Sequence, residues 1–246
     1  MSFPLGVWIL YNGDMKTTII ISADAEWRVV KELFPDLDLQ TSPFGEFAHM
    51  TLGTWNVELF HGGWGKISAA ATAQYVIDHF QPDLLINLGT CGGFAGRVET
   101  GTVMLVERTL VYDIIELMGD GAEAIEHYAT DIDLSWLGER GQWSVEGGEV
   151  RRGLLVSADR DIVVEDIPML IQKYDAVAAD WESGAIAWVA KRNATRLLIL
   201  RGVTDLVGAD GGEAYGNIEL FHTRTKTMMK RLFDKLPGWL DSLVVT

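Results

Sequence analysis

Residues 179–205 read ADWESGAIAWVAKRNATRLLILRGVTD and contain one helix followed by one strand. The apolar residues 185–190 predict the helix, and the run 197–200 predicts a buried strand. Glu182 lies at the start of the helix, and Asp205 follows the strand. Open α/β sheets bind ligands at the carboxyl ends of their strands, so a carboxylate there indicates a site. Two carboxylates facing one crevice suit acid-assisted cleavage of a glycosidic bond, which favours an enzyme.

The same alternation of strand and helix continues through the chain. Strands are expected at residues 17–22, 56–61, 83–88, 102–106, 154–157 and 197–203, and helices at 26–34, 67–80 and 218–236. This order predicts an α/β fold, a three-layer α/β/α sandwich around a central mixed, mostly parallel twisted sheet. We expect a single domain over residues 1–246, with 1–16 as an N-terminal extension and 117–150 as an acidic excursion at the rim.

Composition limits the partners and the compartment. A formal net charge of −15 argues against nucleic acid and anionic membranes, and favours a neutral or cationic small molecule as ligand. No apolar run is long enough to span a membrane, and no basic region precedes the apolar N-terminal residues as in a secretory signal. Cys91 is the only cysteine, which indicates a reducing, cytoplasmic environment.

Each motif also has a structural interpretation without a ligand. The glycine-rich segments 62–66 and 89–93 follow predicted strands, so their amides can cradle a ligand or simply form tight turns. In this interpretation Glu182 does no more than stabilise the dipole of its helix, and Asp205 is a turn residue before Gly208. The five histidines show no metal-ligand spacing, so neither a metal site nor a cofactor is expected. Cys91 has no evident base beside it, which favours a packed thiol over a nucleophile.

Four segments together carry a family resemblance. They are Gly63-Trp64-Gly65-Lys66 before an alanine-rich helix, Asn87-Leu88-Gly89-Thr90-Cys91-Gly92-Gly93, Asp180-Trp181-Glu182 and Arg201-Gly202-Val203-Thr204-Asp205. In order and spacing the chain resembles the purine nucleoside phosphorylase/uridine phosphorylase superfamily from about Thr18 to Leu236. Within it, the chain looks most like the 5′-methylthioadenosine/S-adenosylhomocysteine nucleosidases. The resemblance implies a nucleoside phosphorylase-like fold, a homodimer and cleavage of an N-glycosidic bond.

The resemblance also implies roles for individual residues. Glu182 would accept hydrogen bonds from the ribose 2′- and 3′-hydroxyls, Asp205 would protonate purine N7, and Glu26 would position the attacking water. Thr90, Cys91 and Gly92 would line the pocket beside the sugar. Arg201 would organise the water and the carboxylates.

The choice between water and phosphate as the attacking group depends on the first predicted strand and the residues after it. Phosphorylases of the superfamily have a Gly-Asp-Pro-like loop there with an arginine for phosphate, whereas residues 21–26 of this chain contain no arginine. Glu26 would repel phosphate, so a hydrolase is expected. The spacing from Ala23 is one residue shorter than in the nucleosidases, and the alternative register would place Trp27 at the site.

Two departures from the nucleosidases concern the substrate. Trp181 occupies the position of a methionine, and Asp161 with Ile162 stands where the family has an aromatic residue that stacks on adenine. Two alternatives to the nucleosidase remain open. One is a phosphorylase, or a nucleosidase for a different nucleoside, on the same scaffold, and the other is a nucleoside-binding protein without turnover.

Overall fold

The computed structural model describes residues 15–137, 144–145 and 148–243, so the expected extension at 1–16 lies mostly outside the described residues. Its first half contains β1 (Thr17–Ile21), α1 (Asp24–Leu33), β2 (Gln40–Thr41), β3 (Glu46–Leu52), β4 (Trp55–His61), α2 (Gly65–Phe80), β5 (Leu84–Phe94), β6 (Val103–Val111) and α3 (Gly121–His127). The second half contains β7 (Thr130–Asp131), β8 (Ser144–Val145), β9 (Gly148–Glu149), β10 (Arg151–Ser157), α4 (Ile167–Tyr174), β11 (Ala176–Asp180), α5 (Ser183–Arg192), β12 (Leu197–Gly208), β13 (Gly211–Gly212) and α6 (Ile218–Asp241).

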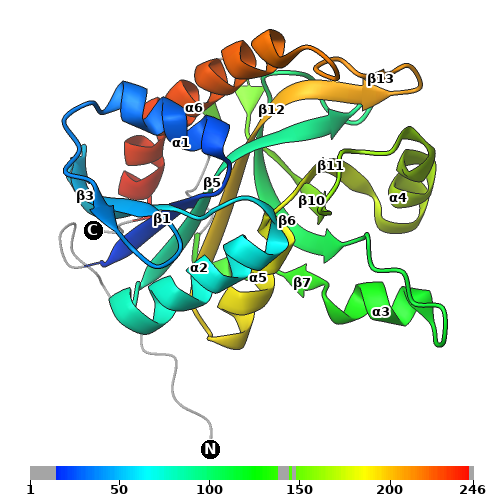
Figure 1. The fold of residues 1–246 in the computed structure, drawn as a ribbon, viewed down its shortest axis with the longest axis horizontal. Coiled ribbons are helices and arrows are strands. Elements are labelled where there is room, and N and C mark those ends of the chain that lie inside the picture. The colour runs from blue at the N-terminus through cyan, green and yellow to red at the C-terminus, as the bar shows by residue number, and fades with distance from the viewer. Residues whose placement is uncertain (1–14, 138–143, 146–147, 244–246) are drawn as a thin grey trace, which may run out of the picture.

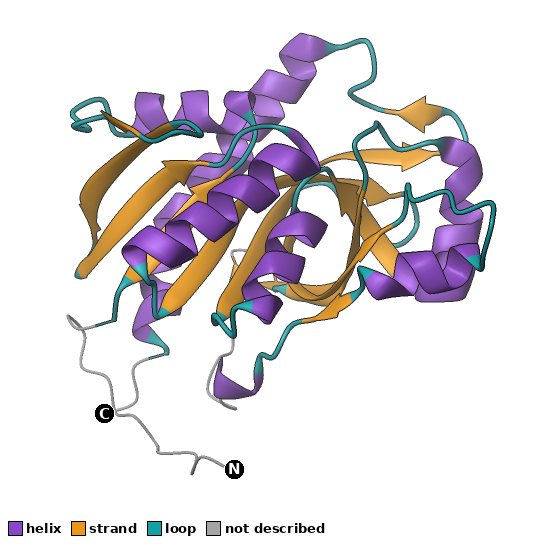
Figure 2. Ribbon diagram, turned by 60° about the horizontal axis from the view of Figure 1, so that its bottom comes forward, coloured by secondary structure: helices purple, strands orange, loops and turns teal. Residues whose placement is uncertain are grey.

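Helices cover both faces of the main sheet, as Figures 1 and 2 show, with α1 and α6 on one face and α2 and α5 on the other. The strand β1 shows why a continuous apolar run is needed. Ile19 and Ile21 pack into the core formed with α1 and α6, whereas Ile20 packs into the core formed with α2 and α5. Successive side chains point to opposite faces, so a strand covered on both faces must be apolar throughout.

The main sheet is mixed rather than mostly parallel, which corrects that part of the prediction. Its order is β13-β12-β6-β10-β11-β5-β1-β4-β3-β2, and an additional pairing of β12 with β5 closes five of these strands into a ring. Strand β5 runs parallel to β1 and β12 but antiparallel to β11. The α/β/α layers that the sequence predicted are present.

Two strands extend further than their apolar runs, and both extensions lie at the site. Residues 89–93 belong to β5 and are not a turn, and β12 continues through Asp205 to Gly208. Glycines here let neighbouring side chains pack directly against the strand backbone. A Cβ at Gly93 would lie 2.5 Å from the Val98 side chain, and one at Gly202 would lie 2.6 Å from that of Met228. The interpretation of Asp205 as a turn residue is therefore wrong.

The remaining differences concern elements that were not expected and the end of the last helix. Strand β11 was not expected, because its Ala-Val-Ala-Ala-Asp sequence has little β propensity and depends on its pairing with β10 and β5 and on burial in the core. The elements β3 and α4 were not expected either. The helix α6 passes through Pro237 and ends one turn later than expected. Among the described residues, no helix is both long and apolar enough to cross a membrane.

Candidate active site

The candidate site lies where the carboxyl ends of three neighbouring strands meet the first turns of two helices. The strand β5 is paired with β1 on one side and with β12 on the other. The chain leaves β1 directly into α1, which carries Glu26, while β12 carries Arg201 and Asp205. The helix α5 begins directly after Glu182. Parallel pairing therefore brings together residues that are far apart in the sequence.

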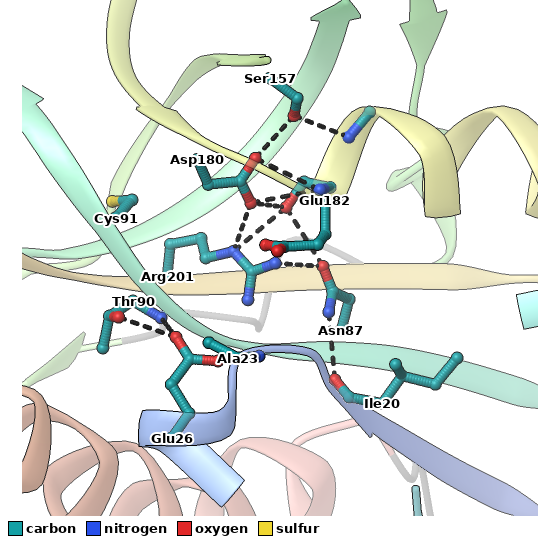
Figure 3. Close-up of polar contacts among 12 residues, drawn as sticks. Ile20, Ala23, Glu26, Asn87, Thr90, Cys91, Ser157, Asp180, Glu182 and Arg201 are labelled. Carbon is teal, nitrogen blue, oxygen red and sulfur yellow. Dashed lines mark hydrogen bonds and ion pairs between the residues drawn. The ribbon is translucent and has the colours of Figure 1, made fainter. Parts of the chain in front are cut away.

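Arg201 is the central cation of this site. It is 1% exposed, and its Nε donates to Asp180 Oδ2 at 2.9 Å and to Ser183 Oγ at 3.1 Å. Its Nη2 donates to the side-chain oxygen of Asn87 at 2.5 Å. Asp180 in turn accepts a hydrogen bond from Ser157 Oγ at 2.6 Å. These contacts fix the guanidinium, which Figure 3 shows between Asp180 and Glu26.

Glu26 is held by two neighbouring segments of backbone. Its Oε1 accepts hydrogen bonds from the N–H of Thr90 at 2.5 Å and from Thr90 Oγ1 at 2.7 Å. Its Oε2 accepts a weaker one from the N–H of Ala23 at 3.4 Å. Burial raises the pKa of Glu26, although Arg201 and Thr90 oppose this effect. A carboxyl group whose pKa is raised in this way is a stronger base than an exposed one and is better suited to accept a proton.

Gly89 separates Glu26 from Arg201. A Cβ at this position would overlap Arg201 Nη1 and would lie 2.8 Å from both carboxyl oxygens of Glu26. The cation and the carboxyl group therefore both pack against the backbone at Gly89, and only glycine leaves room for them. Arg201 Nη1 is buried and has no hydrogen-bond partner among the residues that the structure describes. A buried donor without a partner is costly, so this nitrogen is well suited to a polar ligand.

Glu182 is buried and does not cap its own helix. It is 6% exposed, and its Oε1 accepts a hydrogen bond from the N–H of Gly65, 3.0 Å away, at the start of α2. Burial, together with the neighbouring charge of Asp180, raises the pKa of Glu182 to about 8. The purely structural interpretation fits Asp180 better, because its carboxylate accepts the N–H of Ser183 at 3.2 Å.

Asp205 lies at an irregularity of β12. The pairing of β12 with β5 shifts register between Val203 and Asp205, so Thr204 is the extra residue of a β-bulge. Bulges re-aim side chains, and here the Thr204 hydroxyl donates to Asp205 Oδ1 at 3.0 Å. The backbone of Ala214 hydrogen-bonds the same carboxyl group. Burial raises the pKa of Asp205, which helps it to hold a proton.

The other residues that the sequence predicts for the pocket differ in burial and in contacts. Gly92 faces Ile162, since a Cβ at Gly92 would lie 2.8 Å from Ile162 Cδ1. Cys91 is buried, and burial raises the pKa of its thiol, which agrees with a packed thiol. Asp161 is exposed beside this group. The phenol of Tyr215 donates to the carbonyl of Ile162 at 2.9 Å.

An aromatic pair lies beside Glu182. The rings of Trp64 and Trp181 are stacked, with centroids 5.0 Å apart and planes 26° from parallel. Each tryptophan precedes one partner of the hydrogen bond between Gly65 and Glu182. The side chain of Trp64 remains 65% exposed, so the pair reaches the surface at the rim of the site.

The sequence analysis did not assign several residues that complete the site. Asn87, Ser157 and Ser183 hold Arg201 and Asp180, and Trp64 and Tyr215 lie at the rim. One signal was available, because an asparagine within an apolar buried strand requires a hydrogen-bond partner. The geometry favours the register with Glu26 at the site, because Glu26 lies beside Thr90, whereas the Trp27 indole donates to Glu46 at 2.7 Å.

Comparison with known proteins bears on this arrangement. A family model described as the phosphorylase superfamily matches residues 17–236. The chain belongs to this superfamily. The match begins with β1 and ends within α6, so it includes every residue of the candidate site described above. The family resemblance drawn from the sequence motifs is confirmed.

Two curated relatives carry the same name. The chain is 29% identical over 184 residues to a 5′-methylthioadenosine/S-adenosylhomocysteine nucleosidase of Maridesulfovibrio salexigens, covering 71% of this chain and 80% of the relative. It is 25% identical over 206 residues to the nucleosidase of that name from Marinomonas sp., covering 80% of this chain and 88% of the relative.

Solved structures of such nucleosidases share the fold. The enzyme of Neisseria meningitidis, in complex with methylthio-immucillin-A, superposes with a TM-score of 0.73 at 21% identity and covers 93% of this chain and 100% of its own. The S-adenosylhomocysteine nucleosidase of Streptococcus pyogenes, in complex with 5-methylthiotubericidin, gives a TM-score of 0.75 at 20% identity, with coverages of 94% and 98%. The predicted nucleoside phosphorylase-like fold is confirmed.

Proposed function

We propose that this protein hydrolyses the N-glycosidic bond of a purine nucleoside similar to 5′-methylthioadenosine or S-adenosylhomocysteine. The products are the free base and a ribose derivative. The observation that carries the proposal is the approach of the Glu26 carboxyl group and Arg201 Nη1 to one point beside Gly89, where Nη1 is a buried donor without a partner among the described residues. Water fits between a hydrogen-bond acceptor and a donor of this kind. The names of the relatives support the substrate class.

The chemistry follows from the positions of the three carboxyl groups. Asp205 donates its proton to N7 of the purine as the bond between N9 and C1′ breaks, so the base leaves in neutral form. Glu182 accepts hydrogen bonds from the ribose 2′- and 3′-hydroxyls, which orient the sugar. Water held by Glu26 and Arg201 attacks C1′, and Glu26 accepts its proton. General acid catalysis of this kind contributes about 10²- to 10⁴-fold.

Phosphate is a poorer nucleophile in this site than water. Its negative charge would lose hydration beside the buried carboxyl groups of Glu26 and Glu182, and either group would repel it when ionised. Arg201, the guanidinium beside Glu26, already binds Asp180 and Asn87. A phosphorylase therefore remains the weaker candidate.

Product analysis tests the proposal. We expect nucleosides of this class to release free base and free ribose derivative at a rate that does not change with added phosphate. Glu26→Gln should slow release by at least about 100-fold while substrate still binds. Glu32→Gln, on the same helix and exposed, is the matched control and should retain activity. Ribose 1-phosphate among the products would overturn the assignment, and tight binding without base release would favour the non-catalytic alternative.

The rim suggests that two copies of the chain associate. Apolar side chains that are strongly exposed flank the ion pair between Lys66 and Asp113; they are Trp64, Ile67, Ile115, Leu117 and Met118. We propose that a second copy covers this face in a homodimer, since large exposed apolar patches mark interaction sites. Light scattering tests this: Ile67→Asp should convert dimer to monomer, and a monomeric wild-type protein would contradict it.

We further propose a cytoplasmic location. The support is chemical: the chain has a single cysteine, Cys91, which is buried as a free thiol and thus makes no stabilising disulfide. Fractionation of cells that express the native protein tests the location, and recovery outside the cytosolic fraction would contradict it.

A further inference from the structure

Asp205, the acid of the proposed reaction, lies beside residues 213–214 and Arg224, which the sequence did not predict as site residues. Backbone groups on both sides of this residue are bound by one ion pair. Arg224 on α6 donates from Nη1 to the carbonyl of Thr204 at 3.1 Å and to Glu213 Oε2 at 2.6 Å. Glu213 Oε2 also accepts the N–H of Leu206 at 3.3 Å. The ion pair thus fixes the strand immediately before and after Asp205.

The β-bulge explains why this ion pair is needed. At Thr204 the ladder between β12 and β5 is irregular, so nearby backbone groups need other partners. Arg224 and Glu213 supply them, and the N–H of Glu213 returns a hydrogen bond to the carbonyl of Leu206 at 3.0 Å. The next residue, Ala214, hydrogen-bonds the Asp205 carboxyl group itself. Arg224, Ala214 and Glu213 therefore hydrogen-bond three consecutive residues of β12, with Asp205 in the middle.

We propose that Glu213 and Arg224 are positioning residues for Asp205: their ion pair holds the strand on both sides of it, and their opposite charges act together on its carboxyl group. The proposal rests on the proposed function for the role of Asp205 as acid. The two charges oppose each other at this carboxyl group: Glu213 raises its pKa and Arg224 lowers it, beside the larger effect of burial. Arg224 lowers the pKa of Glu213 itself, so both partners are charged near neutral pH.

Two other titratable groups that interact with Asp205 carry no charge in this range. Cys91 on β5 and Tyr215 after β13 both interact with Asp205 electrostatically. Burial raises the pKa of the Cys91 thiol, and burial with Asp161 and Asp205 raises that of Tyr215 to about 12. Glu26, Asp180 and Arg201 also interact electrostatically with the Cys91 thiol. Glu213 and Arg224 are thus the charges whose removal isolates the effect.

The pH profile of kcat/KM for base release tests the proposal. Asp205 acts while protonated, so activity falls as pH rises through its pKa. Glu213→Gln leaves Arg224 unopposed and should move this basic limb to lower pH. Arg224→Gln leaves Glu213 unopposed and should move it to higher pH. Both partners are partly exposed, at 44% and 29%, so screening limits each shift to about half to one pH unit.

Control variants separate electrostatics from structural damage. The double variant of Glu213 and Arg224 should return the limb to near the wild-type position, and Arg224→Lys should hold it there. Asp234→Asn and Lys230→Gln make the same charge changes in an exposed ion pair on α6 and should not move the limb. If Glu213 and Arg224 had only a structural role, both single variants would lose activity, but their basic limbs would not shift in opposite directions.

The outcomes distinguish this inference from the proposed function. If the single variants release base but the basic limbs of their pH profiles do not move, or move in the same direction, the inference fails and the proposed function stands. If the wild-type protein releases no base, the proposed function fails. The ¹³C NMR titration of the Asp205 carboxyl, assigned with Asp205→Asn, then still decides the inference, because it should show the same opposite shifts.

Discussion

The variant Glu182→Gln measures how much unfolding free energy the protein loses when a buried carboxyl group in its site ionises. Glu182 is 6% exposed and accepts one hydrogen bond, from Gly65. Burial and the charge of Asp180 raise its pKa from 4.5 to about 8. Glutamine has nearly the same shape and can accept the same hydrogen bond, but it does not titrate. A comparison of the two proteins therefore measures the cost of ionising Glu182.

The sign follows from proton linkage. Because the pKa is higher in the folded chain than in the unfolded chain, the contribution of the protonated group to stability is complete below pH 4.5 and is lost as pH rises to about 8. These two values correspond to a loss of about 3 kcal/mol in unfolding free energy between pH 5 and pH 8. Glu26 and Asp205 titrate in the same direction, but they do so in both proteins.

Urea unfolding at pH 5 and at pH 8 provides the measurement. Glu182→Gln should become more stable relative to wild type by about 3 kcal/mol on going from pH 5 to pH 8. Glu99→Gln removes an exposed carboxylate and should follow the wild type at both pH values. If Glu182→Gln and wild type lose stability equally between the two pH values, the reasoning from burial is refuted.

Three further variants test the proposed mechanism by the rate of base release. Asp205→Asn should lower the rate by about 10²- to 10⁴-fold with the circular dichroism unchanged, because asparagine cannot deliver a proton; near-normal turnover would remove Asp205 as the acid. Glu182→Gln should impair ribonucleosides far more than 2′,3′-dideoxynucleosides, which lack the hydroxyls, and equal losses would exclude the sugar contact. Gly89→Ala should reduce the rate by about 100-fold or more, because its Cβ would overlap Arg201 Nη1. Gly238→Ala, which meets no atom within 4 Å, is its control, and an active Gly89→Ala enzyme would show that this close packing is not required.

The sequence by itself determined the layers of the fold and the principal carboxylates. The run Thr17–Ile21 had to be a strand covered on both faces, because successive isoleucines point to opposite sides of the sheet. Local order along the chain also placed Glu182 at a helix start. Asp205 was recognisable because it follows an apolar run, even though the strand continues beyond it. These features depend on neighbours in the sequence, which is why pattern alone found them.

Only the tertiary structure decided which of these groups face one another. Glu26 and Arg201 meet across Gly89 because β1 and β12 pair with opposite sides of β5, and no local pattern encodes that pairing. The extension of β5 through its glycines and the bulge at Thr204 likewise depend on partner strands. A side chain's hydrogen bonds, burial and pKa are set by residues brought together in folding, so the chemistry of the site was decided at that level.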